Sequence, residues 1–277
     1  MGKRIILITG CSSGIGLDAA RRLQARGWRV FASCRRAEDC ARLQAEGLAS
    51  PRIDYEDADS IANGLAEVLA ASGGRLDALF NNGAHGLLGA VEDVPTEALR
   101  QIFESNLFGW HDLTRRVLPV MRAQGHGRIL HCSSVLGLGA VRWRGAYVAT
   151  KFALEGLADS LRLELRGSNI HVSLIEPGPI TTDFRIKGRA YFERWIDWPA
   201  SPHADHYRDH LLPRLNAAGV TPDPFERPPA SVTAQVIRAL DTRRPKARYY
   251  VTVPTHIMGL ARRVLPVRLL DLLLARS

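Results

Sequence analysis

The sequence has few cysteines, no long apolar run and fewer acidic than basic residues. Its four cysteines are Cys11, Cys34, Cys40 and Cys132. They include no CxxC pair and no closely spaced framework, which indicates free thiols in a reducing compartment. No apolar stretch reaches the length of a bilayer span, and no apolar leader with a cleavage site opens the chain. We therefore expect a cytoplasmic protein without a membrane-spanning helix.

The shortage of acids is concentrated at one end of the chain. The 277 residues carry a formal net charge of +9, and most of it lies in 242–277, where eight basic residues accompany the single acid Asp271. A nearly neutral body argues against nucleic acid as a partner. The basic, leucine-rich tail at 256–277 is too short to span a bilayer. It would contact an anionic membrane periphery, cap a pocket, enter a subunit interface or pack on its own core, and the sequence leaves these alternatives open.

Short apolar runs alternate with helical patterns along most of the chain. Near-continuous apolar runs predict strands that are covered on both faces, and alternation with helices predicts parallel pairing. We expect a single α/β domain at 1–255, a Rossmann-type doubly wound parallel sheet with helices on both faces. The runs predict strands at 4–9, 28–33, 76–80, 128–132 and 170–175, and the longest helical patterns lie at 15–26, 96–122 and 146–166.

The segment 181–229 interrupts this alternation because it is rich in prolines and aromatic residues. An insertion of this length in a compact domain is typical of a substrate lid. The alternative is a small helical subdomain that packs on its own aromatics. His206 and His210 have a spacing that can bind a metal on a helix, with His203 close by. No cysteine is near and prolines break the segment, so we expect polar lid surface and no metal site.

A glycine-rich turn follows the first predicted strand and leads directly into a helix. Small residues let a backbone approach a pyrophosphate closely, and a helix N-terminus offers unpaired N–H groups to it. The serine hydroxyls can add hydrogen-bond donors. We expect the phosphate-binding residues to be Gly10, Ser12, Ser13, Gly14, Ile15 and Gly16.

The end of the second predicted strand indicates which dinucleotide binds. NAD sites need a carboxylate there, whereas NADP sites need a cation for the 2′-phosphate. The sequence reads Ser33-Cys34-Arg35-Arg36, and Asp39 follows only later, in the next helical pattern. Arginine can bind a phosphate through two parallel hydrogen bonds. Arg35 and Arg36 therefore favour NADP(H), although a solvated arginine pair is the alternative.

These motifs, in order over about 3–178, resemble the short-chain dehydrogenase/reductase family in its ordinary, non-extended branch. The Thr9-Gly10-xxx-Gly14-x-Gly16 turn is followed by Asp54, which resembles the acid that contacts adenine. Asn81-Asn82-Gly83-Ala84 is similar to the family's Asn-Asn-Ala-Gly with the last two residues exchanged. The pattern Tyr147-xxx-Lys151 stands thirteen residues after Ser134. The nearest group is that of the 17β-hydroxysteroid and retinol dehydrogenases and aldehyde reductases.

The resemblance implies further residues and an oligomer. Asn106 resembles the helix asparagine that joins the proton relay through a water. Asn82 and the motif formed by Pro177, Gly178, Ile180 and Thr182 would contact the cofactor. Family members often form homodimers or homotetramers through two long helices, which here would be 96–122 and 146–166.

A carbonyl that accepts hydride needs a donor for its oxygen, and Tyr147 is the expected acid. Lys151 lies one turn further along the helix, where its charge would lower the phenol pKa. The resemblance adds hydrogen bonds from Lys151 to the nicotinamide ribose. Ser134 would hold the substrate oxygen. We expect NADP(H)-dependent interconversion of a carbonyl and an alcohol on an apolar aldehyde, ketone, retinoid or steroid. The alternatives are a weakly catalytic NADP(H) sensor that acts through partners, and epimerisation or dehydration on the same fold.

Overall fold

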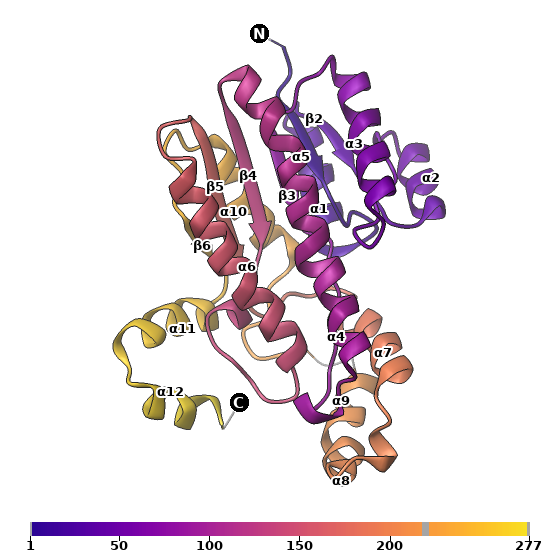
Figure 1. The fold of residues 1–277 in the computed structure, drawn as a ribbon, viewed down its shortest axis with the longest axis vertical. Helices are drawn as coiled ribbons and strands as arrows, with labels where there is room; N and C mark the ends of the chain where they lie inside the picture. The colour runs from indigo at the N-terminus through magenta and orange to yellow at the C-terminus, as the bar shows by residue number, and fades with distance from the viewer. Residues whose placement is uncertain (1, 218–221, 276–277) are drawn as a thin grey trace.

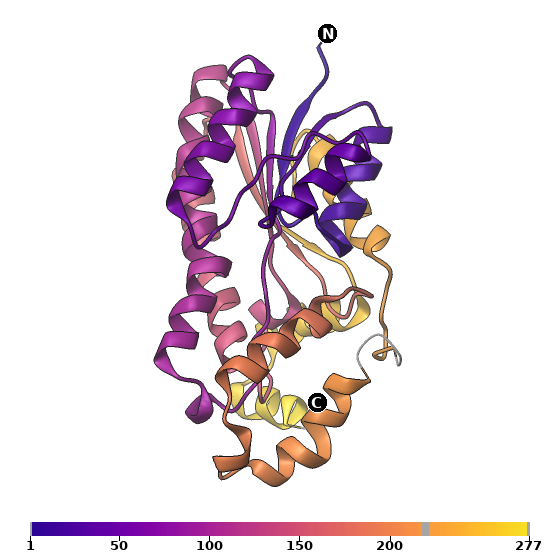
Figure 2. The ribbon, with the colours of Figure 1, turned by 90° about the vertical axis from the view of Figure 1, so that its right-hand side faces the viewer.

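The computed structural model describes residues 2–217 and 222–275. They form one parallel sheet with helices on both faces, which confirms the expected fold class (Figures 1 and 2). The strand order is β2-β1-β3-β4-β5-β6: the chain moves from β1 to one side for β2 and then to the other side for β3, so the order reverses at β1 and β3. Ligands bind such sheets beyond the carboxyl ends of the strands at this reversal. The strands are β1 Ile5–Ile8, β2 Arg29–Ala32, β3 Ala78–Asn81, β4 Gly127–Cys132, β5 Ile170–Glu176 and β6 Arg248–Tyr250.

Helices cover both faces of the sheet (Figure 2). One layer contains α1 (Gly14–Ala25) and α10 (Pro229–Asp241), which pack together; α2 (Ala37–Ala45) lies beyond the edge of the sheet near β2. The other contains α3 (Ala58–Ser72), α5 (Gly109–Gln124) and α6 (Gly145–Glu164). Leu163 of α6 and Phe108, which directly precedes α5, are exposed. Self-association through this layer stays a prediction.

The helix expected at 96–122 is interrupted. The chain forms α4 (Thr96–Phe103), a π-helical turn at Glu104–Phe108, and then α5. Two side chains in the turn bond to the loop that follows β3: Ser105 Oγ lies 2.9 Å from His85 Nδ1, and Asn106 Nδ2 donates to the His85 carbonyl at 2.9 Å. Side chains that bond to backbone and neighbouring groups compete with regular helix geometry, and single π turns often mark functional sites.

The central strands β1, β3, β4 and β5 are buried on both faces, with one half-buried residue each in β4 and β5, as their apolar runs predict. All four cysteines are free and buried, in agreement with the expectation from their spacing. Among the helices of the described ranges, none combines the length and the hydropathy that crossing a bilayer requires.

The proline-rich segment folds into short helices below the sheet (Figure 1). Phe192 and Tyr207 are fully buried there and form an apolar cluster with Leu87 from the loop after β3 and Ile102 from α4. The aromatics of the segment therefore pack on one another and on the body of the domain, and its role as a substrate lid stays a prediction. Its helices are α7 Phe184–Trp195, α8 Ala204–His206 and α9 Leu212–Asn216; residues 218–221 of the expected lid lie outside the described residues.

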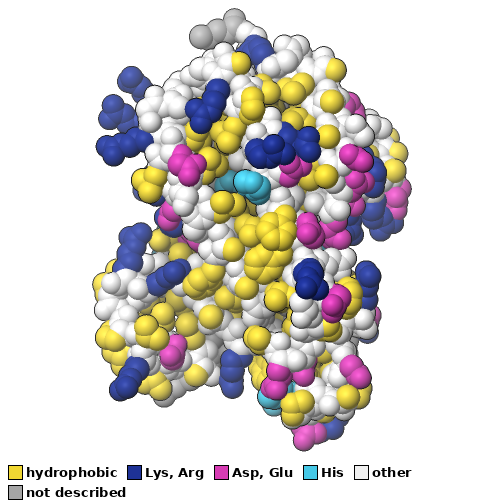
Figure 3. All heavy atoms as spheres, viewed as in Figure 1, with side chains coloured by type: hydrophobic (Ala, Val, Ile, Leu, Met, Phe, Trp, Pro, Cys, Tyr) yellow, Lys and Arg dark blue, Asp and Glu magenta, His cyan; other side chains and the backbone are white. Residues whose placement is uncertain are grey.

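The C-terminal tail packs on the protein itself through α11 (Val253–Val264), which is followed by α12 (Val267–Leu274). Arg262 Nη1 donates to the Gly137 carbonyl at 2.8 Å, in the turn after β4. The opposite side of α11 is apolar and exposed, and Figure 3 shows such side chains gathered at the lower left. Own-protein packing is thus the alternative that the structure shows for α11. Residues 276–277 of the expected tail lie outside the described part.

A partly buried ionic cluster joins α6, β5 and β6. Arg248 Nη2 lies 2.9 Å from Glu155 Oε2 and 2.7 Å from Asp159 Oδ2, and Arg248 Nε lies 3.2 Å from Glu176 Oε1. Glu155 also accepts a hydrogen bond of 2.5 Å from Ser133 Oγ. Burial raises the pKa of Glu176 to about 9, with a further contribution from the charge of Glu155. Three acids around one arginine therefore favour a protonated Glu176.

This raised pKa predicts a pH-dependent stability. The folded protein holds a proton on Glu176 that the unfolded chain, with a pKa near 4.5, has released. The free energy of unfolding should fall as pH rises from about 5 towards 9, by up to about 1.4 kcal/mol per pH unit from this group. Glu176→Gln should flatten that slope in urea denaturation.

Asp159→Asn is the matched control because Asp159 contacts the same arginine but has a lowered pKa. Its titration lies below this pH range, and burial is a larger cause of the raised Glu176 pKa than the charge of Asp159, so most of the wild-type slope should remain. Equal slopes for wild type and Glu176→Gln would contradict the assignment.

Candidate active site

The glycine turn after β1 is held by very close backbone packing. Gly10 has a φ of 67°, and a Cβ there would lie 2.5 Å from the Cα of Gly83. A Cβ on Gly16 would lie 2.5 Å from the Gly10 carbonyl oxygen. Asn82 fixes the same approach from the end of β3, because its backbone N–H donates to Thr9 Oγ1 at 2.9 Å. A larger residue at position 10 would push the turn away from the loop after β3.

The turn presents unpaired backbone donors. The backbone N–H groups of residues 12–16, among them that of Ile15, donate no hydrogen bond to any residue in 2–217 or 222–275. The N-cap Ser13 makes no side-chain cap, and the first turn of α1 holds no acid. Thr182 packs against the turn, since a Cβ on Gly14 would lie 3.0 Å from its Cγ2. These features fit a bound phosphate, which would accept from the free N–H groups.

Ser134 and Tyr147 meet at the carboxyl end of β4. Ser134 lies two residues after the strand, is 8% exposed, and accepts a hydrogen bond from the Leu136 N–H at 3.1 Å. The half-buried Tyr147 comes from the start of α6. Burial raises the pKa of the Tyr147 phenol above its ordinary value, and a hydrogen bond with Ser134 opposes this shift. The two hydroxyl groups therefore lie close enough to influence each other, as the spacing of the two residues predicts.

Lys151 is buried one turn after Tyr147. Its ammonium donates to the Cys132 carbonyl at 2.8 Å and lies 4.4 Å from the centroid of a Trp110 ring. It lies 5.5 Å from the centroid of the Tyr147 ring. Burial lowers the pKa of Lys151 to about 8. The group is still mostly protonated at neutral pH, and so it is a cation beside the phenol.

One electrostatic prediction is wrong. We expected Lys151 to lower the Tyr147 pKa, but the dominant effect is burial, which raises it. The lysine lies beside the ring and is bonded to the end of β4, so its charge does not offset the loss of water around the phenol. At neutral pH the phenol is therefore protonated and able to donate.

Asn106 is fully buried and does not bond to Lys151. Its Oδ1 accepts from the His85 N–H at 3.1 Å, and its Nδ2 also lies 3.4 Å from Thr150 Oγ1. Its side chain thus connects the loop after β3 to the helix that carries Tyr147. A role for Asn106 in holding a water stays a prediction.

The segment after β5 contacts both the turn that holds Ser134 and the glycine turn after β1. The carbonyl of Pro177 accepts from the N–H of Val135, which follows Ser134. Gly178 lies against Thr252, where a side chain would collide, and Thr182 Oγ1 donates to the Ile180 carbonyl at 3.4 Å. The predicted Pro177–Thr182 motif thus extends from the serine turn to the glycine turn.

The two arginines after β2 have different surroundings. Arg35 Nη1 donates to the hydroxyl of Tyr191 in α7 at 3.1 Å, and the charge of Asp54 contributes to the raised pKa of Arg35. Arg36 pairs with Glu38 at the start of α2 instead. Arg35 is therefore bonded to α7 and lies within the influence of the Asp54 charge, whereas Arg36 is bound to its own helix.

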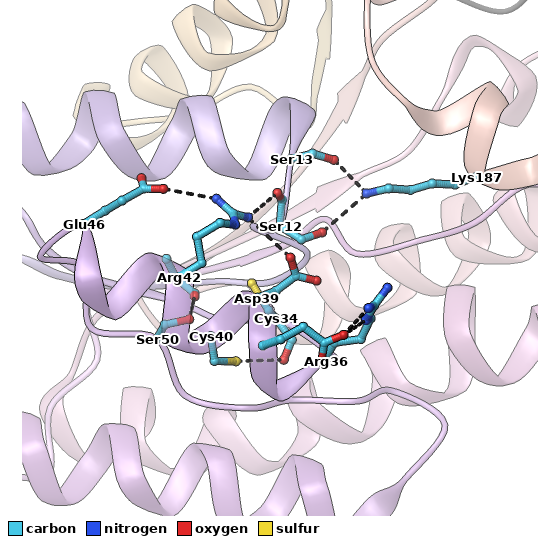
Figure 4. A network of polar contacts seen from close by, with 12 residues as sticks. Ser12, Ser13, Cys34, Arg36, Asp39, Cys40, Arg42, Glu46, Ser50 and Lys187 are labelled. Carbon is cyan, nitrogen blue, oxygen red and sulfur yellow. Dashed lines mark hydrogen bonds and ion pairs between the residues drawn. The ribbon is translucent and has the colours of Figure 1, made fainter.

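Several residues around the site carry no clear sequence signal. Lys187 Nζ lies 2.7 Å from Ser13 Oγ, and Arg42 Nη2 donates to the Ser12 carbonyl at 2.7 Å (Figure 4). The Phe184 ring packs edge-on against Tyr147, with 5.5 Å between centroids. The aromatic content of 181–229 indicated a functional segment, but nothing in the pattern identified these individual side chains.

The geometry agrees with what related proteins show. The family model for the short chain dehydrogenases matches residues 4–191. The chain belongs to this family of oxidoreductases, which confirms the resemblance drawn from its motifs and the expected capacity to bind a nucleotide.

Relatives extend over nearly the whole chain. The uncharacterized oxidoreductase YbbO of Escherichia coli is 38% identical over 272 residues, which cover 98% of this chain and 94% of YbbO. Human retinol dehydrogenase 8 is 34% identical and covers 88% of this chain and 80% of its own. Human 17-beta-hydroxysteroid dehydrogenase type 1 is 34% identical, with 91% and 78% covered. A short-chain dehydrogenase from Streptomyces avermitilis has a similar structure, with a TM-score of 0.80 at 30% identity over 98% of this chain and 96% of its own.

Proposed function

We propose that the protein interconverts a carbonyl and an alcohol with NADP(H), using Tyr147 as general acid and base. The observation that carries this proposal is that Ser134 lies near the Tyr147 phenol, beside the Lys151 ammonium and at the carboxyl ends of the strands. A nicotinamide dinucleotide, when bound, supplies or accepts the hydride. The chain's own residues bind the partners and move the proton.

The three side chains divide the proton chemistry. Ser134 donates a hydrogen bond to the substrate oxygen and holds it against Tyr147. The protonated phenol then gives its proton to the developing alkoxide. The resulting phenolate is stabilised by the nearby Lys151 ammonium, whose pKa of about 8 keeps it mainly charged at neutral pH. In the oxidative direction Tyr147 accepts the proton.

The remaining residues fit a dinucleotide along the ends of β1 to β5. The unpaired N–H groups of residues 12–16 would hold the pyrophosphate, and Arg35 would bind a 2′-phosphate. Asp54 would contact the adenine. The segment from Pro177 to Thr182, with Asn82 and Lys151, would hold the nicotinamide half.

An apolar, medium or large substrate fits the surroundings of Tyr147. Phe184 packs against the phenol and is 39% exposed, so an apolar side chain faces the place where the carbonyl must lie. The names of two relatives point to retinol and to a hydroxysteroid, which are apolar alcohols. We infer an aldehyde, ketone, retinoid or steroid as the substrate class.

Removing the phenolic hydroxyl tests the mechanism. Tyr147→Phe should lower kcat by about 10²- to 10⁴-fold on the best substrate of an aldehyde, ketone, retinoid and steroid panel, because the general acid is lost. NADPH oxidation followed by absorbance measures the rate, and fluorescence titration checks that cofactor binding is kept. Tyr250→Phe, a change in β6 at the edge of the sheet, is the control and should keep the wild-type rate.

Full activity of Tyr147→Phe would show that the acid lies elsewhere. A wild type that binds NADPH but turns over no member of the panel would instead favour the alternative function, a sensor that responds to the nucleotide without catalysis.

Cofactor preference is tested at the end of β2. Arg35→Ala should weaken NADPH binding by about 10- to 100-fold, because charge-assisted hydrogen bonds to the 2′-phosphate are lost, and should leave NADH binding nearly unchanged. Isothermal titration calorimetry measures both affinities. Arg29→Ala, at the opposite end of the same strand, is the control. Equal losses for the two nucleotides would contradict the NADP(H) assignment.

A further inference from the structure

One face of α7 contacts three separate parts of the nucleotide-binding and catalytic residues. Phe184 packs on Tyr147, Lys187 lies on the serines of the glycine turn, and Tyr191 hydrogen-bonds Arg35. Positions three and four residues apart share a face of a helix, so these three side chains form one row. The row runs from the expected nicotinamide end, past the pyrophosphate turn, to the expected 2′-phosphate end.

Lys187 has no carboxylate partner in the part of the chain that the structure describes, and its ammonium lies on two serine hydroxyls instead. Its Nζ lies 2.7 Å from Ser13 Oγ and 3.4 Å from Ser12 Oγ, as Figure 4 shows. Among the described residues, no carboxylate forms an ion pair with it. The neighbouring cation Arg42, by contrast, is paired with Asp39 and Glu46.

The position is also electrostatically unfavourable without an anion. The N-terminus of α1 carries the positive end of the helix dipole, its first turn holds no acid, and its leading N–H groups are unpaired. An ammonium group at the same place adds a second positive charge. A phosphate between them would accept hydrogen bonds from both and remove the repulsion.

We propose that Lys187 binds the pyrophosphate of the dinucleotide and so couples α7 to the bound cofactor. This inference rests on the proposed function only in taking the ligand to be a dinucleotide. The ammonium moves from the Ser12 and Ser13 hydroxyls to the phosphate oxygens.

Other contacts fix α7 against the loop after β3, so the contact of Lys187 with the cofactor would also set the position of Phe184. Gly188 is buried next to Gly86 of the loop after β3, and Tyr191 stacks on His85 with 3.7 Å between ring centroids. Phe184, three residues before Lys187, then lies on Tyr147. A cofactor bound through Lys187 therefore also fixes the apolar side chain that faces the substrate.

Binding of nucleotide fragments distinguishes the proposed role of Lys187 at the pyrophosphate from that of Arg35 at the 2′-phosphate. Lys187→Gln should weaken NADPH, NADH and ADP-ribose by a similar factor of about ten, the effect of one charge-assisted hydrogen bond. Adenosine 2′-monophosphate, which has no pyrophosphate, should bind as it does to the wild type. Lys187→Arg should recover most of the loss, because a guanidinium also binds phosphate. Calorimetric titration measures each affinity.

Arg189→Gln is the matched control, since Arg189 lies on the same helix but pairs with Glu193. It should leave all four affinities unchanged. Wild-type affinity of Lys187→Gln for ADP-ribose would overturn the proposal, as would an equal loss for adenosine 2′-monophosphate, which would indicate a damaged turn. ADP-ribose carries neither a 2′-phosphate nor a nicotinamide, so a tenfold loss there supports Lys187 even if Arg35→Ala shows no preference for NADPH.

Discussion

The hydrogen bond from the Lys151 ammonium to the Cys132 carbonyl is the contact on which the site depends. A buried ammonium is costly unless its donors are satisfied and its charge is stabilised. Here the end of β4 supplies the acceptor and the Trp110 ring lies 4.4 Å away. Because the lysine is on α6, this contact fixes that helix against the strand. Tyr147, one turn earlier, is thereby held at Ser134, which follows β4.

Close backbone packing likewise fixes the glycine turn after β1 against the loop after β3. Gly10 and Gly83 approach so closely that neither β1 nor β3 can end differently without moving the other. Asn106 continues this connection to α6 through His85 and Thr150. The glycine turn and α6 are therefore linked by a chain of direct contacts, and α7 lies against both.

The sequence predicts those parts of this arrangement that depend on residues close together in the chain. Apolar runs such as 4–9 and 128–132 predict the strands, because a strand covered on both faces has no polar side. The spacing of Ser134, Tyr147 and Lys151 predicts their meeting, because a strand end and one helix turn are regular structures. The π turn at Glu104–Phe108 was not predictable, since it depends on hydrogen bonds to a loop some twenty residues earlier.

The other features that the sequence did not predict depend on contacts between residues far apart in the chain. Lys187 and Ser13 are 174 positions apart, and no periodicity in a proline-rich segment indicates which of its cations reaches the turn. The direction of the Tyr147 pKa shift also needs coordinates, because it depends on how much water burial removes. The pairing of Arg36 with Glu38 is local, and the Arg-Arg-Ala-Glu sequence at 35–38 could have indicated it.

The most direct test of the central claim, that Ser134 and Tyr147 act together on one substrate oxygen, is a double-mutant cycle. The turnover of Ser134→Ala, Tyr147→Phe and the double variant would be compared on one carbonyl substrate with cofactor in excess. Residues that act as a unit show strongly non-additive losses. The account predicts that the double variant is little slower than the slower single variant. Losses that multiply would show that the two hydroxyls act independently and would contradict it.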